Sequence, residues 1–219
     1  MNQELISSLI HLMGMLFLVS SFAMIASPQL LSCIRFYAMH SFFLAAITAL
    51  VAYGSHVEHL YVPAILTLIL KTWVIPQIFF RLIGRLSIRR ENDSYINIPF
   101  SLVLATFMVF AAYYATGDLK VLNPAFSNEF VPLAIATILI GMLMMVTRKK
   151  AISQVLGLLL LENGLFLMAV TMTFGMPLLV ELGIFFDVLV GAIMMGIFVF
   201  KIRDAFDGID TDDLTGLKG

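Results

Sequence analysis

The residues in this chain best suited to chemistry are ionisable side chains that interrupt long apolar stretches. A charged group at the centre of a bilayer costs at least about 2.5–3.5 kcal/mol, so it normally faces protein or water and marks a functional site. The candidates are His40, Lys71, Glu162, Glu181 and Asp187. Burial disfavours the charged forms of carboxyl and amine groups, and histidine titrates near neutrality, so these groups could exchange protons at modest cost. The chemistry indicated is a proton relay.

Helix geometry places four of these groups at one depth. At a rise of 1.5 Å per residue, His40, Lys71, Glu162 and Asp187 each lie roughly 14–16 Å from one end of their apolar stretch. Glu181 lies only about 5 Å from the outer end of its stretch, where water reaches it more easily. Four ionisable groups near the midplane predict a lateral polar layer across a helix bundle.

Structural explanations of the same residues stay open. Lys71 could form a static ion pair, with Asp187 or with Glu162, that holds two parts of the bundle together. Asn163, which supports the site next to Glu162, could satisfy that carboxyl or a neighbouring carbonyl in a purely structural polar cluster. His40 could be a satisfied packing histidine. The sequence alone supports both a relay and a set of fixed contacts.

The composition explains why such groups would be buried in a membrane. The 219-residue chain is 61% hydrophobic and 12% charged, with a net charge of −1 and a mean hydropathy of +1.01. These values exclude a soluble globular enzyme, a disordered tail and a nucleic-acid-binding surface. The single cysteine, Cys33, cannot form an internal disulfide or a cysteine metal site. The fold class predicted is an all-α, polytopic membrane protein.

Seven stretches are long and apolar enough to cross about 30 Å of hydrocarbon as helices. They cover 5–25, 30–53, 60–83, 96–116, 130–146, 153–174 and 178–201. When the span ends are numbered alternately, every flanking lysine and arginine except Lys120 falls on one side. The positive-inside rule then predicts an inner-membrane protein with its N-terminus outside and its C-terminus in the cytoplasm.

An internal repeat is indicated by a shift of 122 residues, which lays the first span on the fifth and the second on the sixth. His40 then falls opposite Glu162. Shortening the next loop by six residues lays the third span on the seventh, with Lys71 opposite Asp187. The predicted organisation is two parallel three-helix repeats joined by a single helix. Its parts are an N-terminal repeat at 1–90, a connector helix at 91–126, a C-terminal repeat at 127–203 and an acidic tail at 204–219, either solvated or a docking strap.

Several of these residues lie in segments that resemble the hydrogenase-4 component E family. The segments are Leu161-Glu162-Asn163-Gly164, Val180-Glu181-Leu182-Gly183-Ile184 with Asp187, and the ending Asp213-Leu214-Thr215-Gly216-Leu217-Lys218-Gly219. The last part of the chain is also similar to the small three-helix K subunit of complex I, whose mid-membrane glutamates belong to the proton path. The resemblance implies that Glu162 holds the first of those positions. Asp187 falls roughly at the second, with Glu181 nearby as the other candidate.

The resemblance implies a non-redox membrane subunit of a group 4 nickel–iron hydrogenase or formate hydrogenlyase-type complex. Such a subunit links antiporter-like membrane subunits to the anchor of a soluble hydrogenase-type or dehydrogenase arm, and carries part of a lateral proton or sodium path. We expect no cofactor in this chain, and a nickel–iron centre and iron–sulfur clusters in partner subunits. The alternatives are a structural adaptor without an ion path and a free-standing small transporter. An enzyme in its own right is the least supported, because no catalytic constellation faces water.

Overall fold

The computed structural model describes residues 3–55, 57–86, 94–117 and 124–173, together with Gly183 and Gly191. The elements in these ranges are α1 (Gln3–Ala26), α2 (Leu30–Ser55), a 3₁₀ turn η1 (Glu58–Leu60), α3 (Tyr61–Ile69), a π-helical segment η2 (Leu70–Val74), α4 (Ile75–Leu86), α5 (Ile98–Thr116), α6 (Pro124–Thr147) and α7 (Ala151–Thr173). The described ranges contain no strand, so the all-α prediction is confirmed.

Six segments of the described chain are long and apolar enough to cross a membrane. They are Ser8–Ala26, Leu30–Ser55, Glu58–Ile83, Ile98–Thr116, Phe130–Thr147 and Ala151–Met172. Their bounds agree with the first six predicted stretches to within a few residues. The seventh predicted stretch, 178–201, lies outside the described residues except for Gly183 and Gly191, which are both helical. The prediction of a polytopic membrane protein is therefore confirmed.

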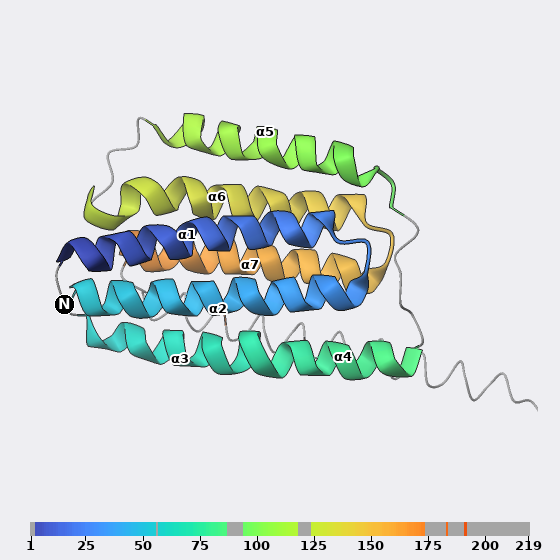
Figure 1. Cartoon of the computed structure of the whole chain (residues 1–219), viewed down its shortest axis with the longest axis horizontal. Helices are drawn as coiled ribbons and strands as arrows, with labels where there is room; N and C mark the ends of the chain where they lie inside the picture. Colours follow the sequence, from blue (N-terminus) through green and yellow to red (C-terminus); the bar gives the residue numbers. More distant parts are fainter. Residues whose placement is uncertain are drawn as a thin grey trace, which may run out of the picture.

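The helices form an elongated bundle in which neighbours run up and down (Figure 1). α1, the α3–α4 span and α6 run in one direction, and α2, α5 and α7 return. α2 contacts α1, the α3–α4 span and α7, so it joins the N-terminal helices to the C-terminal pair. α5 contacts α6 and α1 only through one face, and just 17% of its span is buried. The most buried spans are those of α6 and α7, at 67% each, followed by that of α2 at 50%.

The apolar interior is divided into two clusters. One cluster fills the end of the bundle where α1 meets α2, and it includes Met24, Tyr37, Phe79 and Leu156. The other fills the opposite end. Its members include Ile10, Phe17, Leu44, Leu60, Phe130 and Leu167. Buried polar side chains lie between the residues of the two apolar clusters on five of the helical segments.

These side chains are called the polar layer below. Its members are Ser20 and Ser21 of α1, His40 and Ser41 of α2, Lys71 of η2, Thr137 of α6, and Glu162 and Asn163 of α7. All eight are buried, and each helix places them between residues of the two apolar clusters. The predicted lateral layer is therefore present in the described part of the chain, with serines and a threonine added to the expected ionisable groups.

Candidate functional site in the polar layer

An ion pair lies at the centre of the polar layer. Lys71 Nζ lies 2.6 Å from Glu162 Oε1, and the two side chains are only 4% and 7% exposed. Lys71 also donates to Asn163 Oδ1 at 3.2 Å. The sequence left Asp187 and Glu162 as possible partners of Lys71, and in the structure Lys71 pairs with Glu162. Three predicted site residues from opposite halves of the chain are thus in direct contact.

Lys71 is positioned by a local departure from the α-helix. In η2 the Ile75 N–H donates to the Leu70 carbonyl, five residues earlier, which widens the turn around Lys71. Pro76 follows directly, and because proline has no N–H it cannot donate to the carbonyl four residues before it. π-helical turns of this kind are rare and frequently mark functional sites. Here the wide turn carries the cation of the ion pair.

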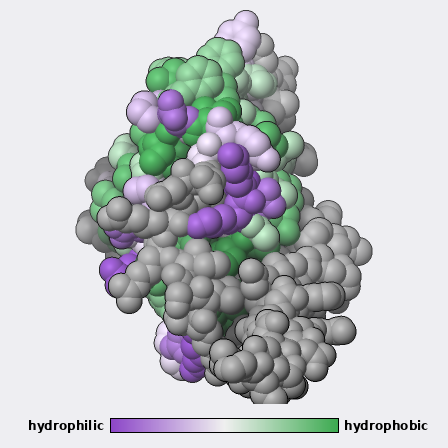
Figure 2. Space-filling view, turned by 90° about the vertical axis from the view of Figure 1, so that its right-hand side faces the viewer, coloured by the Kyte–Doolittle hydropathy of each residue, from purple (hydrophilic) through white to green (hydrophobic). Residues whose placement is uncertain are grey.

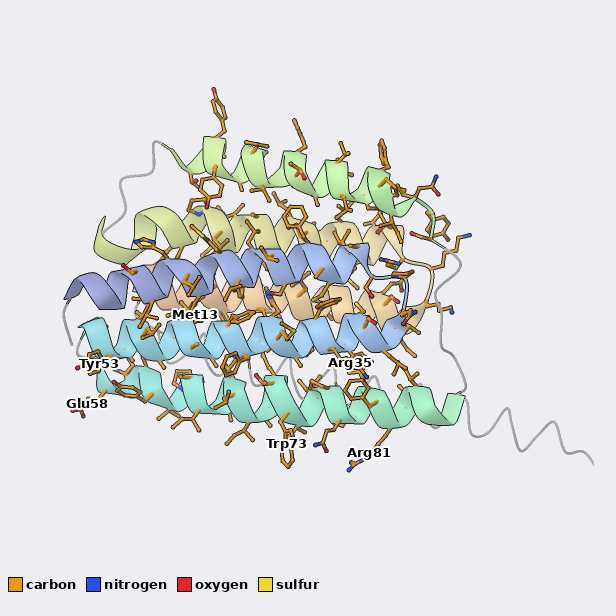
Figure 3. The ribbon with its side chains drawn as sticks, viewed as in Figure 1. Met13, Arg35, Tyr53, Glu58, Trp73 and Arg81 are labelled. Carbon is orange, nitrogen blue, oxygen red and sulfur yellow. The ribbon has the colours of Figure 1, made fainter. Side chains whose placement is uncertain are left out.

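The wide turn also keeps one face of the third span buried. The residues Lys71, Ile75, Phe79 and Ile83 are all buried, at four-residue intervals. In an uninterrupted α-helix each four-residue step drifts by about 40° around the axis, because a turn takes 3.6 residues. A wider first turn takes up part of that drift. Trp73, which lies between Lys71 and Ile75 in the sequence, is 64% exposed and points away from the bundle (Figure 3).

Glu162 and Asn163 are positioned by close contact between α6 and α7. A Cβ atom at Gly141 would lie 2.6 Å from the Leu161 backbone nitrogen, and one at Gly164 would lie 2.9 Å from the Ala134 carbonyl oxygen. Only glycine therefore fits at these crossings. Since the glycines bring one face of α7 against the α6 backbone, the position of the carboxyl and amide groups on α7 is fixed relative to α6.

The hydrogen bonds of the layer continue from the ion pair into α2. Asn163 Nδ2 donates to Ser41 Oγ at 3.0 Å. These two residues are 122 positions apart, which is the offset that relates the two predicted repeats. The repeat itself and its domain boundaries stay a prediction. The amide thus connects the ion pair to the helix that carries His40.

His40 is bound to α1 rather than to the ion pair. Its Nδ1 lies 3.0 Å from the Phe17 carbonyl oxygen and 3.0 Å from Ser20 Oγ, with Ser21 Oγ at 3.4 Å. Its ring stacks on that of Phe17, with centroids 3.8 Å apart. The prediction that His40 lies in the layer is met, although its direct contacts are with residues that were not singled out in the sequence.

Of the predicted site residues, the structure brings Lys71, Glu162 and Asn163 into contact and places His40 on the adjoining helix. Glu181 and Asp187 lie outside the described residues. Gly183 is described, and a Cβ atom built on it would lie 3.8 Å from Glu162 Oε1. Gly183 therefore lies beside the Glu162 carboxyl. The proton-relay roles of all the predicted site residues, Glu181 and Asp187 included, remain predictions.

The arrangement can hold and transfer a proton. Two buried charges are stabilised only by good geometry and additional hydrogen bonds, and both are present here. If the Nζ–H bond breaks and an Oε1–H bond forms, the pair becomes neutral, and at 2.6 Å this transfer needs little movement. No group of three or more metal-ligating side chains occurs among the described residues. The oxygen atoms of Glu162 and Asn163 accept hydrogen bonds from the ammonium group of Lys71.

A second buried cation lies at the end of the bundle. Arg148 is 4% exposed, and its Nη2 donates to the Ile25 carbonyl at 2.6 Å and to the Ser27 carbonyl at 3.3 Å. These acceptors lie at and just after the C-terminus of α1, where the helix dipole favours a positive charge. Hydrophilic side chains gather near the middle of this end face, with apolar ones around them (Figure 2). The end with the predicted cytoplasmic cations is thus held together by one of them.

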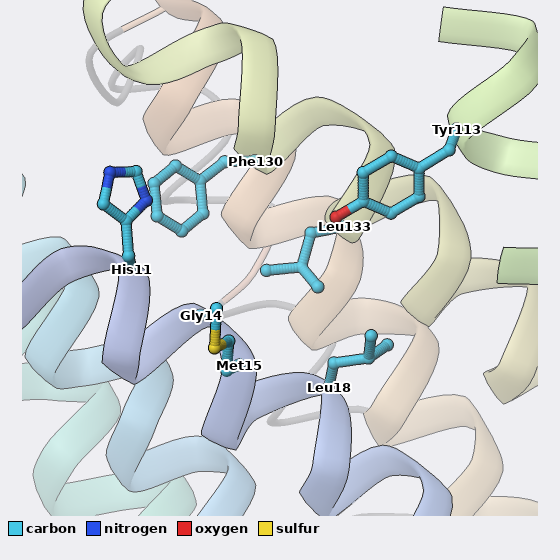
Figure 4. A pocket seen from close by; sticks show the side chains of 7 residues that line it. All are labelled: His11, Gly14, Met15, Leu18, Tyr113, Phe130 and Leu133. Carbon is cyan, nitrogen blue, oxygen red and sulfur yellow. The ribbon is translucent and has the colours of Figure 1, made fainter. Parts of the chain in front are cut away.

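A groove of about 450 Å³ opens between α1, α5 and α6. Its lining is mainly apolar and consists of His11, Gly14, Met15, Leu18, Tyr113, Phe130 and Leu133 (Figure 4). None of these residues belongs to the polar layer. The groove is therefore separate from the ion pair.

Comparison with known proteins places the chain in a class. Residues 130–219 match the family model described as NADH-ubiquinone/plastoquinone oxidoreductase chain 4L, and this region includes Glu162 and Asn163. With its spanning helices and mid-membrane ion pair, the chain is a membrane subunit of the complex I-like class.

The particular family follows from full-length relatives. An uncharacterized protein of Mycobacterium tuberculosis, Rv0085, is 32% identical over 87% of each chain. Hydrogenase-4 component E of Escherichia coli is 26% identical over 95% of this chain and 96% of its own length. The chain belongs to the hydrogenase-4 component E family, as its sequence motifs predict. No solved structure matches it.

Proposed function

We propose that this chain carries part of a lateral ion path, coupled to redox chemistry in other subunits of a hydrogenase-type assembly. The observation that carries the proposal is the buried Lys71–Glu162 ion pair inside a polar layer that crosses the bundle. The carboxyl accepts a proton from the ammonium or from a neighbouring group and returns it. Glu181 and Asp187 are the proposed further carboxyls of the path, and protons are the ion that these groups suit best.

The proposed partners are antiporter-like membrane subunits, a membrane anchor and a soluble hydrogenase-type or dehydrogenase arm. The nickel–iron centre and iron–sulfur clusters would belong to that arm, and this chain would hold no cofactor. We place the assembly in the cytoplasmic membrane, with the Arg148 end of the bundle inside. The acidic tail 204–219, which lies outside the described residues, would then be available to a cytoplasmic partner.

The experiment that tests the path is Glu162→Gln in the intact complex, with proton translocation measured per electron in membrane vesicles. The glutamine keeps the shape and removes the charge, so translocation should fall at least about tenfold, in the range of lost proton-transfer catalysis. Full translocation at the normal rate would overturn the proposal.

The same variant separates the path from the second candidate function, a structural adaptor. Close glycine packing and the static appearance of the ion pair favour an adaptor, for which Glu162→Gln would reduce the amount of assembled complex and leave translocation per complex unchanged. Purification in mild detergent with mass spectrometry tests the assembly itself. A chain that is stable and active alone would indicate a free-standing transporter.

A further inference from the structure

His40 has a feature that the Lys71–Glu162 pair does not explain. The side chain is fully buried, and its Nε2 atom has no hydrogen-bond partner in the described structure. A buried nitrogen without a hydrogen-bond partner normally destabilises the folded state. A histidine that served only to connect helices would be expected to use both of its ring nitrogens. The unused Nε2 therefore calls for a functional explanation.

The other ring nitrogen shows which protonation state is favoured at rest. Nδ1 lies 3.0 Å from the Phe17 carbonyl oxygen, which can only accept a hydrogen bond. Ser20 Oγ and Ser21 Oγ also donate to this carbonyl, at 2.7 and 3.2 Å. When Nδ1 carries the hydrogen and donates to Phe17, Nε2 is left as the basic nitrogen of a neutral ring.

Some neighbours of the ring favour a positive charge, while full burial and the like charge of Lys71 oppose it, so a proton would be held only for a time and then released. The Phe17 ring is stacked on the imidazole at 3.8 Å, and an aromatic face attracts cations. The Phe17 carbonyl and the two serine hydroxyls present oxygen atoms to Nδ1. Because these partners are all neutral, they stabilise an imidazolium without trapping it in an ion pair.

We propose that His40 is a second proton-holding site, formed by α1 and α2 with Ser20 and Ser21 as its positioning residues. A proton binds at Nε2 as the Lys71 Nζ–H bond or the O–H bond of a protonated Glu162 breaks, and it later leaves from the same nitrogen. The charged groups of the layer on the other side of the Ser41–Asn163 bond are Lys71 and Glu162. The site lies before residue 130, outside the region matched by the chain 4L model.

The inference rests on the proposed ion path, and the test separates the two. His40→Asn keeps an amide near the Nδ1 position and removes the basic Nε2. In the intact complex, we expect proton translocation per electron to fall at least about tenfold, as for a lost proton-transfer group. The matched control is Thr48→Val on the same helix, because the Thr48 hydroxyl is buried and bonds only its own helix at Leu44. It should translocate normally.

The results of the two variants show whether the role of His40 or the whole ion path is wrong. Normal translocation in His40→Asn with loss in Glu162→Gln would overturn the role of His40 and leave the ion path standing. Normal translocation in both would overturn both. If His40→Asn does not assemble, the double variant Ser20→Ala/Ser21→Ala decides. Losing oxygens that stabilise the imidazolium makes proton loading harder, so the alkaline limit of translocation should move to lower pH, and an unchanged pH profile would overturn the proposal.

Discussion

Two cations are buried in the described part of the chain, and they differ in what surrounds them. Lys71 lies at mid-span, 2.6 Å from a carboxyl that can take its proton. Arg148 lies at the end of the bundle, and its Nη2 donates to backbone carbonyls at the end of α1. Lysine and carboxyl can both change charge when buried, whereas arginine stays protonated and carbonyls do not titrate. In the proposed ion path, equal burial would serve two purposes: proton exchange at the first site and fixed connection of helices at the second.

The largest effect is expected from Lys71→Met. This change leaves Glu162 buried without its ammonium, and breaking a buried ion pair from one side typically costs about 3–5 kcal/mol. We expect much less assembled complex and a lower thermal stability, measured by co-purification and by thermal unfolding in detergent.

Lys71→Arg is the matched control for this variant. It retains a cation that cannot release its proton, so the complex should assemble while translocation falls sharply. A Lys71→Arg complex that translocates like the wild type would show that proton exchange at residue 71 is not required.

A smaller effect is expected from Arg148→Met. The change removes the donor to the Ile25 carbonyl and should cost about 1–3 kcal/mol, the usual penalty for an unsatisfied buried group. Thermal stability should fall, with translocation per assembled complex unchanged. Arg148→Lys, which can restore one donor, should recover part of the stability. If a stable Arg148→Met complex lost translocation, Arg148 would not be purely structural, and the proposed difference between the two cations would be wrong.

The smallest effect is expected from Ser41→Ala, which removes the acceptor of the Asn163 amide. One neutral hydrogen bond contributes about 1 kcal/mol, so assembly should be nearly normal. Translocation should fall modestly, because Asn163 also accepts from Lys71 and loses its fixed orientation. The control is Ser101→Ala, a buried serine on α5 away from the layer. Equal effects of the two changes would mean that the Ser41 contact does not support the ion pair.

Much of this site could be predicted from the sequence, because charge within an apolar span is a strong signal. Counting residues from the span ends places Lys71 and Glu162 at one depth, and helix geometry makes that estimate reliable. The choice of Glu162 over Asp187 as the partner could not be made, since depth does not say which helices are neighbours. The resemblance of the last part of the chain to the K subunit of complex I also indicated Glu162, but it gave no information about Lys71 or His40.

The signals for Ser20 and Ser21 in the sequence are weaker, and the signal for Arg148 is misleading. Serine and threonine are common in membrane spans because their hydroxyls can bond to their own helix backbone, as Thr137 does with Leu133. A serine within an apolar span therefore does not by itself indicate a tertiary contact. Arg148 stands next to two lysines, which is typical of an exposed flank, and only the packing of the α1–α2 turn buries it.

The wide turn at Leu70–Val74 has a consequence for how this chain can vary in length. A π-helical turn is equivalent to one residue inserted into an α-helix. Deleting a single residue there would restore the regular α-helix and leave the helix beyond it in nearly the same orientation, with Phe79 still facing the core. The chain could therefore lose one residue here and keep its core, but it would lose the widened turn that carries Lys71. The number of residues between Lys71 and α4 is as much part of the site as the lysine itself.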